Sequence, residues 1–166
     1  MAATPLSILV LCTGNSARSI LGEALLNIRG QGRIVAHSAG SQPKGVPHPA
    51  ALELLRSKGI DTAFARSKSW DEFAGANAPP VDLVITVCDS AAAEACPIWP
   101  GGPVTVHWGI PDPAAITDPP DAVKKAFETA FDQLDERVSA LVALDFEVMA
   151  PVDLKQALAD VHGRSA

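Results

Sequence analysis

Short apolar runs and stretches of helical periodicity alternate along most of the chain. Four runs rich in apolar and β-branched residues predict strands, at residues 7–11, 33–38, 81–88 and 102–108. Helical spacing and start and stop signals predict helices at residues 20–28, 49–59, 67–75, 121–144 and 152–161. This alternation of strand and helix is typical of an α/β protein.

The predicted strands carry few polar residues, which indicates that both faces of the sheet are covered. Strands of this kind, joined by helices, form parallel sheets. We therefore expect a three-layer α/β/α fold with a four-stranded parallel sheet. It forms one domain over residues 1–166, in which residues 145–166 are a helical C-terminal extension. Ligands bind such sheets at the carboxyl ends of the strands, and Cys12 and Cys88 both lie at such ends.

Composition and charge narrow the classes of function. The chain has 166 residues, 48% of them hydrophobic and 19% charged, which suits a compact domain with a real core. Its formal net charge is -6 and its basic residues form no run, which argues against nucleic-acid binding and a polybasic membrane anchor. The first residues match neither a signal peptide nor a membrane span, so a cytoplasmic protein is expected. Three cysteines, an odd number, favour thiol or metal chemistry over a secreted disulfide framework.

The segment from Cys12 to Ser19 has the form C-x5-R-S and follows the first predicted strand. A loop of small residues before a helix can turn its backbone N–H groups inward, and the helix dipole and the Arg18 guanidinium add to their attraction for an anion. These groups favour the thiolate of Cys12, to which Ser19 can donate a hydrogen bond. We predict that Cys12 attacks the central atom of a tetrahedral oxyanion. The expected oxyanion-binding residues are Thr13, Gly14, Asn15, Ser16, Ala17, Arg18 and Ser19.

Cys12 also has a purely structural interpretation, as a buried cysteine beside a surface arginine. Small polar loop residues argue against it, because they do not pack a core.

Residues 10–19, VLCTGNSARS, resemble the phosphate-binding loop of the low-molecular-weight protein tyrosine phosphatases and of the arsenate reductases built on the same fold. Residues 84–102 and 107–114 are similar to the reductase branch in particular. The resemblance covers residues 7–144 and implies a low-molecular-weight tyrosine phosphatase-like fold.

The resemblance implies a cascade of three thiols. Cys12 forms an adduct with arsenate, Cys88 attacks Cys12 and releases arsenite, and Cys96 attacks Cys88. Thioredoxin, or glutathione with glutaredoxin, then reduces the disulfide, and phosphate and sulfate compete with arsenate. An external thiol reductant is therefore expected, with no tightly bound cofactor. No metal is expected either, because three scattered cysteines without a C-x2-C pair make a poor zinc site.

Cys88 and Cys96 also have a less favoured structural interpretation, since cysteine often serves as a small core hydrophobe. The alanine-rich segment between them favours helix, in which they would lie roughly 12 Å apart. A disulfide needs Cα atoms about 4.4 to 6.8 Å apart. If the two form a disulfide, we expect the segment to unwind on oxidation and to carry Cys96 toward solvent.

The segment WGIPDPAA, residues 108–115, resembles the acid loop of the family and implies that Asp112 protonates the leaving oxygen. Asp118 is the competitor, and Asp112 is favoured because it lies closer to the end of the fourth strand. The tyrosine phosphatases carry aromatic residues after this aspartate, whereas two alanines follow here and the chain has no tyrosine. Such a pocket suits a small inorganic oxyanion better than phosphotyrosine.

Family reductases that bind potassium near the loop have an acidic residue where this chain has Lys68, while Asn15, Glu23 and Ser38 match the rest of that pattern. A lysine ammonium can replace the charge of the ion, so no potassium requirement is expected. The favoured function is arsenate reduction by the thiol cascade, with residual phosphatase activity allowed. The alternatives are a tyrosine or aryl phosphatase that uses Cys12, Arg18 and Asp112, and a non-enzymatic oxyanion or redox-sensing module.

Overall fold

A four-stranded sheet forms the centre of the protein. The structure is a computed structural model, which describes residues 4–75, 78–88 and 103–165. All strand pairs are parallel and the spatial order is β2-β1-β3-β4. The strands are β1 (Leu6–Leu11), β2 (Ile34–Ala39), β3 (Leu83–Thr86) and β4 (Val104–His107). The α/β fold with a four-stranded parallel sheet, predicted from the apolar runs, is confirmed.

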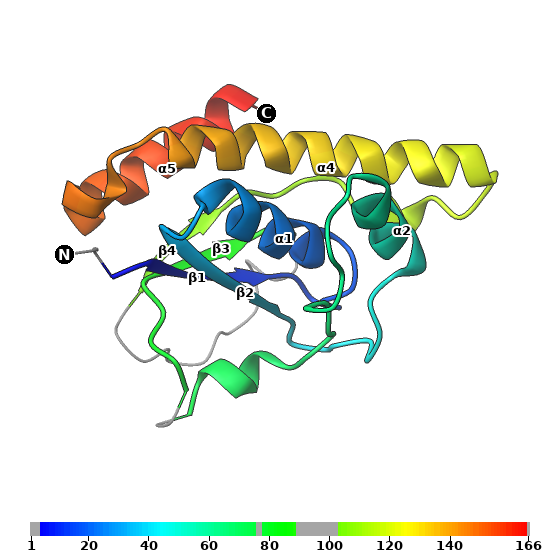
Figure 1. The fold of residues 1–166 in the computed structure, drawn as a ribbon, viewed down its shortest axis with the longest axis horizontal. Helices are drawn as coiled ribbons and strands as arrows, with labels where there is room; N and C mark the ends of the chain where they lie inside the picture. Colours follow the sequence, from blue (N-terminus) through cyan, green and yellow to red (C-terminus); the bar gives the residue numbers. More distant parts are fainter. Residues whose placement is uncertain (1–3, 76–77, 89–102, 166) are drawn as a thin grey trace.

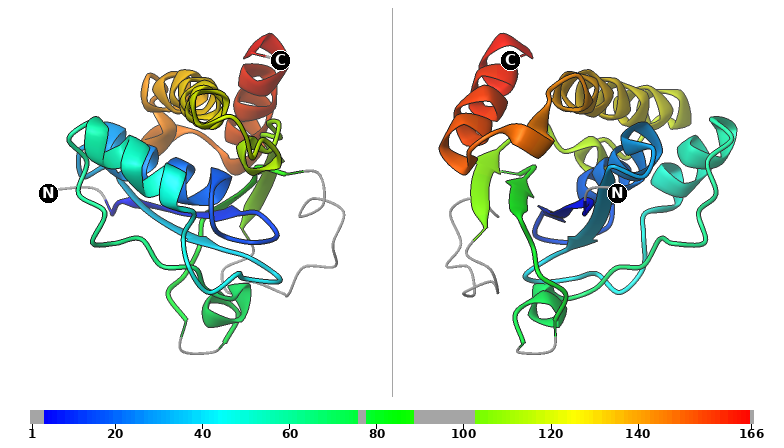
Figure 2. Two further views of the ribbon diagram at one scale, coloured as in Figure 1. Left: turned by 90° about the vertical axis from the view of Figure 1, so that its right-hand side faces the viewer. Right: turned by 60° about the vertical axis from the view of Figure 1, so that its left-hand side comes forward.

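Helices cover both sides of this sheet, but unequally (Figures 1 and 2). The 3-10 helix η1 (Trp70–Phe73) lies on one side, where the sequence predicts a short capped helix, and Ser69 Oγ accepts a hydrogen bond from Asp71 N at its start. Four longer helices lie on the other side: α1 (Arg18–Gly30), α2 (Pro49–Ser57), α4 (Pro120–Val142) and α5 (Pro151–Ser165). All four correspond to helices expected from the sequence.

Local signals set where α2 begins and ends. Pro49 occupies its first turn, where a missing N–H costs nothing, and the His48 ring nitrogen Nδ1 accepts a hydrogen bond of 3.0 Å from Ala50 N. Gly59 follows the helix with a φ of 77°, a left-handed conformation that glycine adopts without steric cost. The start of α2 thereby brings the loop before it, residues 41–48, against the end of β1.

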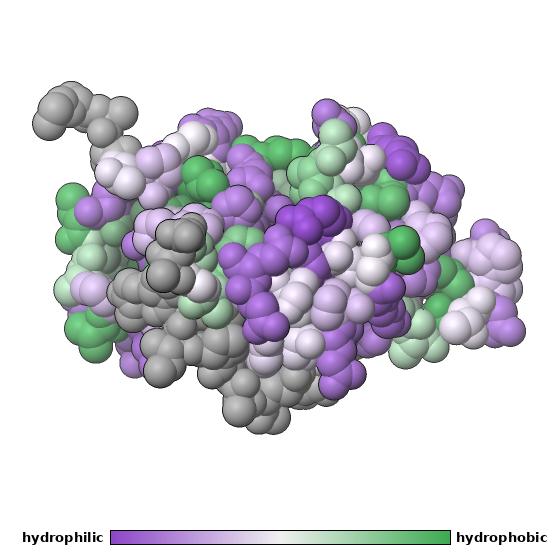
Figure 3. All heavy atoms as spheres, turned by 90° about the horizontal axis from the view of Figure 1, so that it is seen from below, coloured by the Kyte–Doolittle hydropathy of each residue, from purple (hydrophilic) through white to green (hydrophobic). Residues whose placement is uncertain are grey.

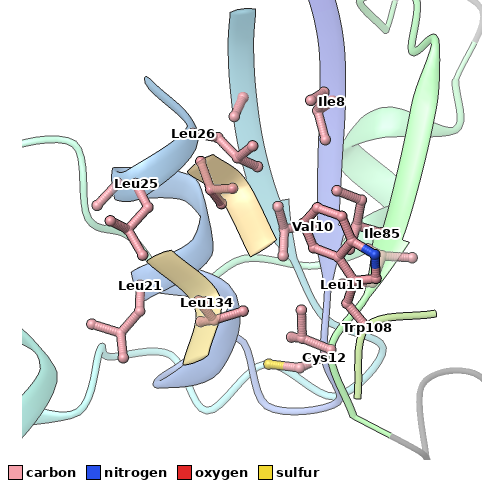
Figure 4. Packing of buried hydrophobic residues seen from close by; sticks show 14 of the residues in the cluster. Ile8, Val10, Leu11, Cys12, Leu21, Leu25, Leu26, Ile85, Trp108 and Leu134 are labelled. Carbon is pink, nitrogen blue, oxygen red and sulfur yellow. The ribbon is translucent and has the colours of Figure 1, made fainter. Parts of the chain in front are cut away.

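The core lies between the sheet and the long helices (Figure 4). Ile8, Leu9, Val10 and Leu11 of the central strand β1 are at most 1% exposed, as expected for a parallel strand covered on both faces. Trp108, which follows β4, is also buried, and its Nε1 donates a hydrogen bond of 2.9 Å to the carbonyl of Leu158. This bond ties α5 to the edge of the sheet.

The strand order creates a crevice at the carboxyl ends of β1 and β3. From β1 the chain crosses to β2 on one side, whereas β3 and β4 lie on its other side. Open parallel sheets bind ligands at such a switch point, because the connections diverge there and leave a gap. Cys12 follows β1, where Figure 4 shows it below Val10 and Leu11, and Cys88 follows β3. The fold therefore brings the ends of both cysteine-bearing strands to one place.

The face seen from below, on the side of η1, carries hydrophilic side chains across its middle, and the more hydrophobic ones are scattered toward its margins (Figure 3). In the part of the chain that the structure describes, we find no helix with the length and apolar character needed to cross a membrane.

Candidate active site

The loop between β1 and α1 is held with its carbonyl groups turned toward the following loops. Three of its peptide oxygens accept backbone hydrogen bonds of 2.8 to 3.0 Å from residues 42–48. The pairs are Gln42 N with Thr13 O, Lys44 N with Gly14 O, and His48 N with Ser16 O. Among the described residues, the N–H groups of residues 14–18 donate to no protein acceptor. They lie at the start of α1, where the sequence predicts an anion site.

Gly40 allows the loop to lie this close to β2. A side-chain carbon at Gly40 would lie 2.4 Å from the carbonyl oxygen of Thr13 and 2.6 Å from that of Cys12, closer than such atoms can approach. Only a residue without a Cβ fits here. Sequence reasoning missed this role, although the position offered a signal, because Gly40 follows directly on the strand that pairs with β1.

A buried hydrogen-bond chain supports Cys12 from behind. Ser19 Oγ lies 2.9 Å from Cys12 Sγ and accepts a hydrogen bond of 2.8 Å from Asn15 Nδ2. Because Asn15 supplies that proton, the Ser19 hydroxyl is left to donate its own hydrogen bond to the sulfur. Asn15 has a φ of 44°, a left-handed conformation that asparagine tolerates better than most residues.

The chain of hydrogen bonds continues from Asn15 to the buried carboxyl group of Glu23. Asn15 Nδ2 donates at 2.9 Å to Ser38 Oγ, and Ser38 Oγ donates at 2.5 Å to Glu23 Oε1. Burial raises the pKa of Glu23, although the bond from Ser38 and the charge of Lys68 act in the opposite direction. Burial likewise lowers the pKa of Lys68, and the charge of Glu23 opposes this. The pair therefore sits in an environment that penalises both charges.

The same cluster bears on the potassium expectation. Asn15 Oδ1 already accepts the backbone N–H of Lys68 at 2.8 Å, and the Lys68 ammonium donates to the carbonyl of Arg66 at 3.1 Å. The cluster thus carries a cationic side chain of its own, and one lone pair of the Asn15 oxygen is already used in a hydrogen bond. In the described part of the chain, no three His, Cys, Asp or Glu side chains gather to hold a metal ion.

Arg18, the first residue of α1, reaches across the crevice to the loop after β4. Its Nη1 donates a hydrogen bond of 3.1 Å to the carbonyl of Ile110, and its Nη2 lies 3.7 Å from Asp112 Oδ2. Asp112 Oδ1 accepts the Ala114 N–H at 3.0 Å at the start of the 3-10 helix η2 (Pro113–Ala115). The Asp112 side chain is 45% exposed. The acid loop is therefore positioned by the guanidinium predicted to bind the oxyanion.

These groups surround a pocket of about 490 Å³ at the switch point. Thr13 Oγ1 lies 3.7 Å from the sulfur of Cys88, which is 3% exposed. Asp112 lines the pocket and its competitor Asp118 does not. The described lining residues are Cys12, Thr13, Gly14, Ser16, Ala17, Arg18, Gln42, Pro43, Lys44, Cys88, Asp112 and Ala114.

The structure thus brings most of the predicted site residues together. Asn15 and Ser19 differ from the rest of the predicted set, because both are fully buried behind the loop and do not line the pocket. Cys96, and the helix expected between it and Cys88, lie outside the described residues. Lys44 and the carbonyl of Ile110 are contacts that sequence reasoning missed, and only their place after a strand end would have suggested them.

Fold and site together place a thiol, a helix start and an arginine opposite an aspartate across one pocket. The sequence model of the low molecular weight phosphotyrosine protein phosphatase family matches residues 7–153. The chain belongs to this family, and the resemblance drawn from its loop is confirmed.

Its relatives include proteins named as arsenate reductases. The arsenate reductase of Bacillus licheniformis is 34% identical over 132 residues, which cover 80% of this chain and 91% of the relative. A crystal structure of arsenate reductase from Archaeoglobus fulgidus has a TM-score of 0.65 at 26% identity, covering 82% of this chain and 99% of that one. A structure described as an arsenate reductase in the phosphate binding state has a TM-score of 0.64 at 28% identity, covering 83% and 97%.

Proposed function

We propose that this protein reduces arsenate to arsenite through its own thiols. The observation that carries the proposal is that two thiols, Cys12 and Cys88, line one oxyanion pocket. Hydrolysis of a phosphate ester needs one nucleophilic thiol, whereas reduction of arsenate needs two electrons, which a pair of thiols can supply. The arsenate reductases among the relatives support the same choice.

The first step is attack of the Cys12 thiolate on arsenic. Arg18 and the N–H groups of the loop hold the oxyanion and stabilise its developing charge. An As–S bond forms as an As–O bond breaks, and Asp112 donates the proton with which the oxygen leaves as water. Ser19 lies beside the sulfur and stabilises the thiolate before the attack.

The second step transfers the electrons. The Cys88 thiolate attacks the sulfur of Cys12, an S–S bond forms, and the electron pair of the As–S bond stays on arsenic, which leaves as arsenite. Cys96 then attacks Cys88, so that Cys12 is released as a thiol and the disulfide joins Cys88 to Cys96. Thioredoxin, or glutathione with glutaredoxin, reduces that disulfide, which fits the cytoplasmic location expected from the sequence. We place the whole cycle in one domain over residues 1–166.

Phosphatase activity is the second candidate, favoured by the membership of a phosphatase family. The same loop, arginine and aspartate would cleave a phosphate ester through a thiol–phosphate intermediate. Ala114 lines the pocket beside Asp112, and a methyl group offers little surface to grip an aromatic ring. We therefore place ester hydrolysis second, as a residual activity.

Steady-state assays of the purified protein separate the candidates. A reductase consumes thioredoxin or glutaredoxin reducing equivalents only when arsenate is added, whereas a phosphatase hydrolyses p-nitrophenyl phosphate without consuming them. A non-enzymatic oxyanion or redox-sensing module does neither. We expect Cys12→Ser and Arg18→Lys to abolish both activities, because a hydroxyl is a far weaker nucleophile and an ammonium lacks the planar fork.

Substitutions of Cys88 and Cys96 separate arsenate reduction from ester hydrolysis more sharply. Cys88→Ser and Cys96→Ser should both stop multiple-turnover arsenate reduction and leave ester hydrolysis in place, because the loop and Arg18 are untouched. Cys96→Ser should still allow one turnover and trap a bond between Cys12 and Cys88, which mass spectrometry would detect. Sustained arsenate turnover by Cys88→Ser would instead mean that an external thiol attacks the adduct directly.

A further inference from the structure

The pocket contains a second cation besides Arg18. Its described charged lining residues are Arg18, Lys44 and Asp112, to which the thiolate form of Cys12 adds a negative charge. Arg18 already divides its guanidinium between Asp112 and the carbonyl of Ile110. When Asp112 carries the proton that it later donates, Arg18 and the thiolate offset one another. Lys44 then supplies the additional positive charge that attracts the incoming dianion.

The backbone places Lys44 at the pocket although its side chain is exposed. Its N–H donates a hydrogen bond of 3.0 Å to the carbonyl of Gly14, which fixes this residue against the loop. Its aliphatic carbons lie along Gly14, where the Cε of Lys44 is 3.2 Å from the position that a Gly14 side chain would take. The stem thus covers the loop, and the ammonium is carried at the edge of the pocket.

Among the described residues, no acidic side chain forms an ion pair with Lys44. The ion pairs among the described residues join Arg18, Arg29, Arg33 and Arg66 to acidic partners, and Lys44 takes part in none of them. His48 belongs to the same loop; burial and the charge of Lys44 lower its pKa, and the charge of Asp112 acts in the opposite direction. His48 is not among the described residues that line the pocket, whereas Lys44 is, so Lys44 is the second cation there.

We propose that Lys44 is an oxyanion-capturing residue, whose ammonium draws a doubly charged tetrahedral anion into the Cys12 pocket and sets the affinity for it. The inference deepens the proposed function and rests on the oxyanion site that it invokes. In a chain with a net charge of -6, an approaching anion is repelled overall, so a local cation at the pocket edge governs its capture. Lys44 takes no part in bond making, so its removal should affect binding rather than the chemical step.

The test measures binding of inorganic phosphate without any turnover. Reduced protein is treated with neutral iodoacetamide at increasing phosphate concentrations, and mass spectrometry follows the alkylation of Cys12. The concentration dependence gives the dissociation constant of phosphate for wild type, Lys44→Met, Lys44→Arg and the exposed control Lys155→Gln. Methionine keeps an unbranched apolar stem over Gly14 and removes only the charge, whereas arginine keeps the charge.

We expect Lys44→Met to weaken phosphate binding about tenfold and to lose most of its dependence on salt concentration. Lys44→Arg and Lys155→Gln should stay within about twofold of wild type. In arsenate turnover, Lys44→Met should raise KM by a similar factor and leave kcat unchanged. A dissociation constant for Lys44→Met equal to that of wild type would overturn the role of Lys44. Failure of phosphate to protect Cys12 in wild type would instead contradict the oxyanion site, and with it the proposed function.

Discussion

Gly40 and the Cys12 loop meet backbone to backbone, and this contact decides how deeply the loop can lie against the sheet. The carbonyl oxygens of Thr13 and Cys12 would both clash with a Cβ at Gly40, and neither can move without rotating a peptide group of the loop. A rotated peptide would turn a carbonyl toward the pocket and an N–H away from it. The anion site therefore depends on a residue that contributes no side chain.

We expect Gly40→Ala to lower the free energy of unfolding by about 1–3 kcal/mol, as forced overpacking does, and to weaken phosphate binding at Cys12 as well. Urea unfolding and the alkylation assay measure the two effects. Gly163→Ala is the matched control, because the added carbon meets no described atom within 4 Å outside the adjoining turns of its own helix, and alanine favours helix. Full stability and full phosphate affinity in Gly40→Ala would show that the loop can shift without loss.

The buried carboxyl of Glu23 predicts a pH dependence of stability. Its pKa is raised above 4.5, chiefly by burial, so from pH 4.5 up to that raised value the native protein binds more protons there than the unfolded chain. The contribution of Glu23 to the free energy of unfolding is therefore fully present below pH 4.5 and is lost as the pH rises through the folded pKa. Glutamine keeps a neutral acceptor for Ser38 and titrates nothing.

Relative to wild type, Glu23→Gln should thus be more stable at about pH 8 than at about pH 5. Urea unfolding of both proteins at the two pH values measures the difference, and the exposed Glu53→Gln provides the reference for loss of a carboxyl group. A stability difference between Glu23→Gln and wild type that stays constant with pH would mean that Glu23 does not titrate in this range.

At the scale of elements, the loop after β4 closes the pocket with an aspartate that Arg18 holds. Asp112 caps η2 with one oxygen and faces Arg18 with the other. Because η2 has only three residues and Asp112 is half exposed, this loop can bring the carboxyl to a bound oxyanion without disturbing the core.

We expect Asp112→Asn to lower kcat for ester hydrolysis about 10²–10⁴-fold, the usual contribution of a general acid, and to leave phosphate affinity largely intact. Asparagine keeps the cap on Ala114 N, so the loop should retain its shape. The control is Asp118→Asn, on the same segment but outside the pocket. If Asp118→Asn has the larger effect, the acid has been assigned to the wrong residue.

The elements that the sequence predicts well are those with a strong local signal. Apolar runs located all four strands, and Pro49 and Gly59 located the ends of α2. The C-x5-R-S spacing identified the loop and Arg18, because these residues are neighbours in the chain. Lys44 and Gly40 were missed, since their roles depend on how the end of β2 packs against the loop after β1. Such contacts join distant residues and leave no periodic trace in the sequence.

At the scale of the whole molecule, α5 lies beside α4 on the same side of the sheet. The part of the chain that matches the family model ends at residue 153, within the first turn of α5. Leu154, Leu158 and Val161 of this helix are buried, and α5 packs on β4 and α4. The bond from Trp108 Nε1 to the Leu158 carbonyl joins the helix to the strand that leads into the acid loop. The apolar face of α5 thus covers the edge strand β4. In the sequence, this helix is distant from the Cys12 loop.

This arrangement predicts that α5 contributes to stability and not to the chemistry of the pocket. Leu158 is fully buried, so Leu158→Ala should lower the free energy of unfolding by about 2–5 kcal/mol. For a protein of this size that corresponds to a loss in Tm of about 2–4 °C for each kcal/mol. Val152→Ala, on the same helix at 72% exposure, should change stability by no more than about 0.5 kcal/mol.

Calorimetry and arsenate turnover on the same samples test both halves of this statement. At a temperature where Leu158→Ala is still folded, its kcat and its phosphate affinity should match those of wild type, because no residue of α5 lines the pocket described above. A fall in kcat at full folding would mean that the bond between Trp108 and α5 also positions the acid loop. Equal stability losses from Leu158→Ala and Val152→Ala would contradict the packing of α5 against the sheet.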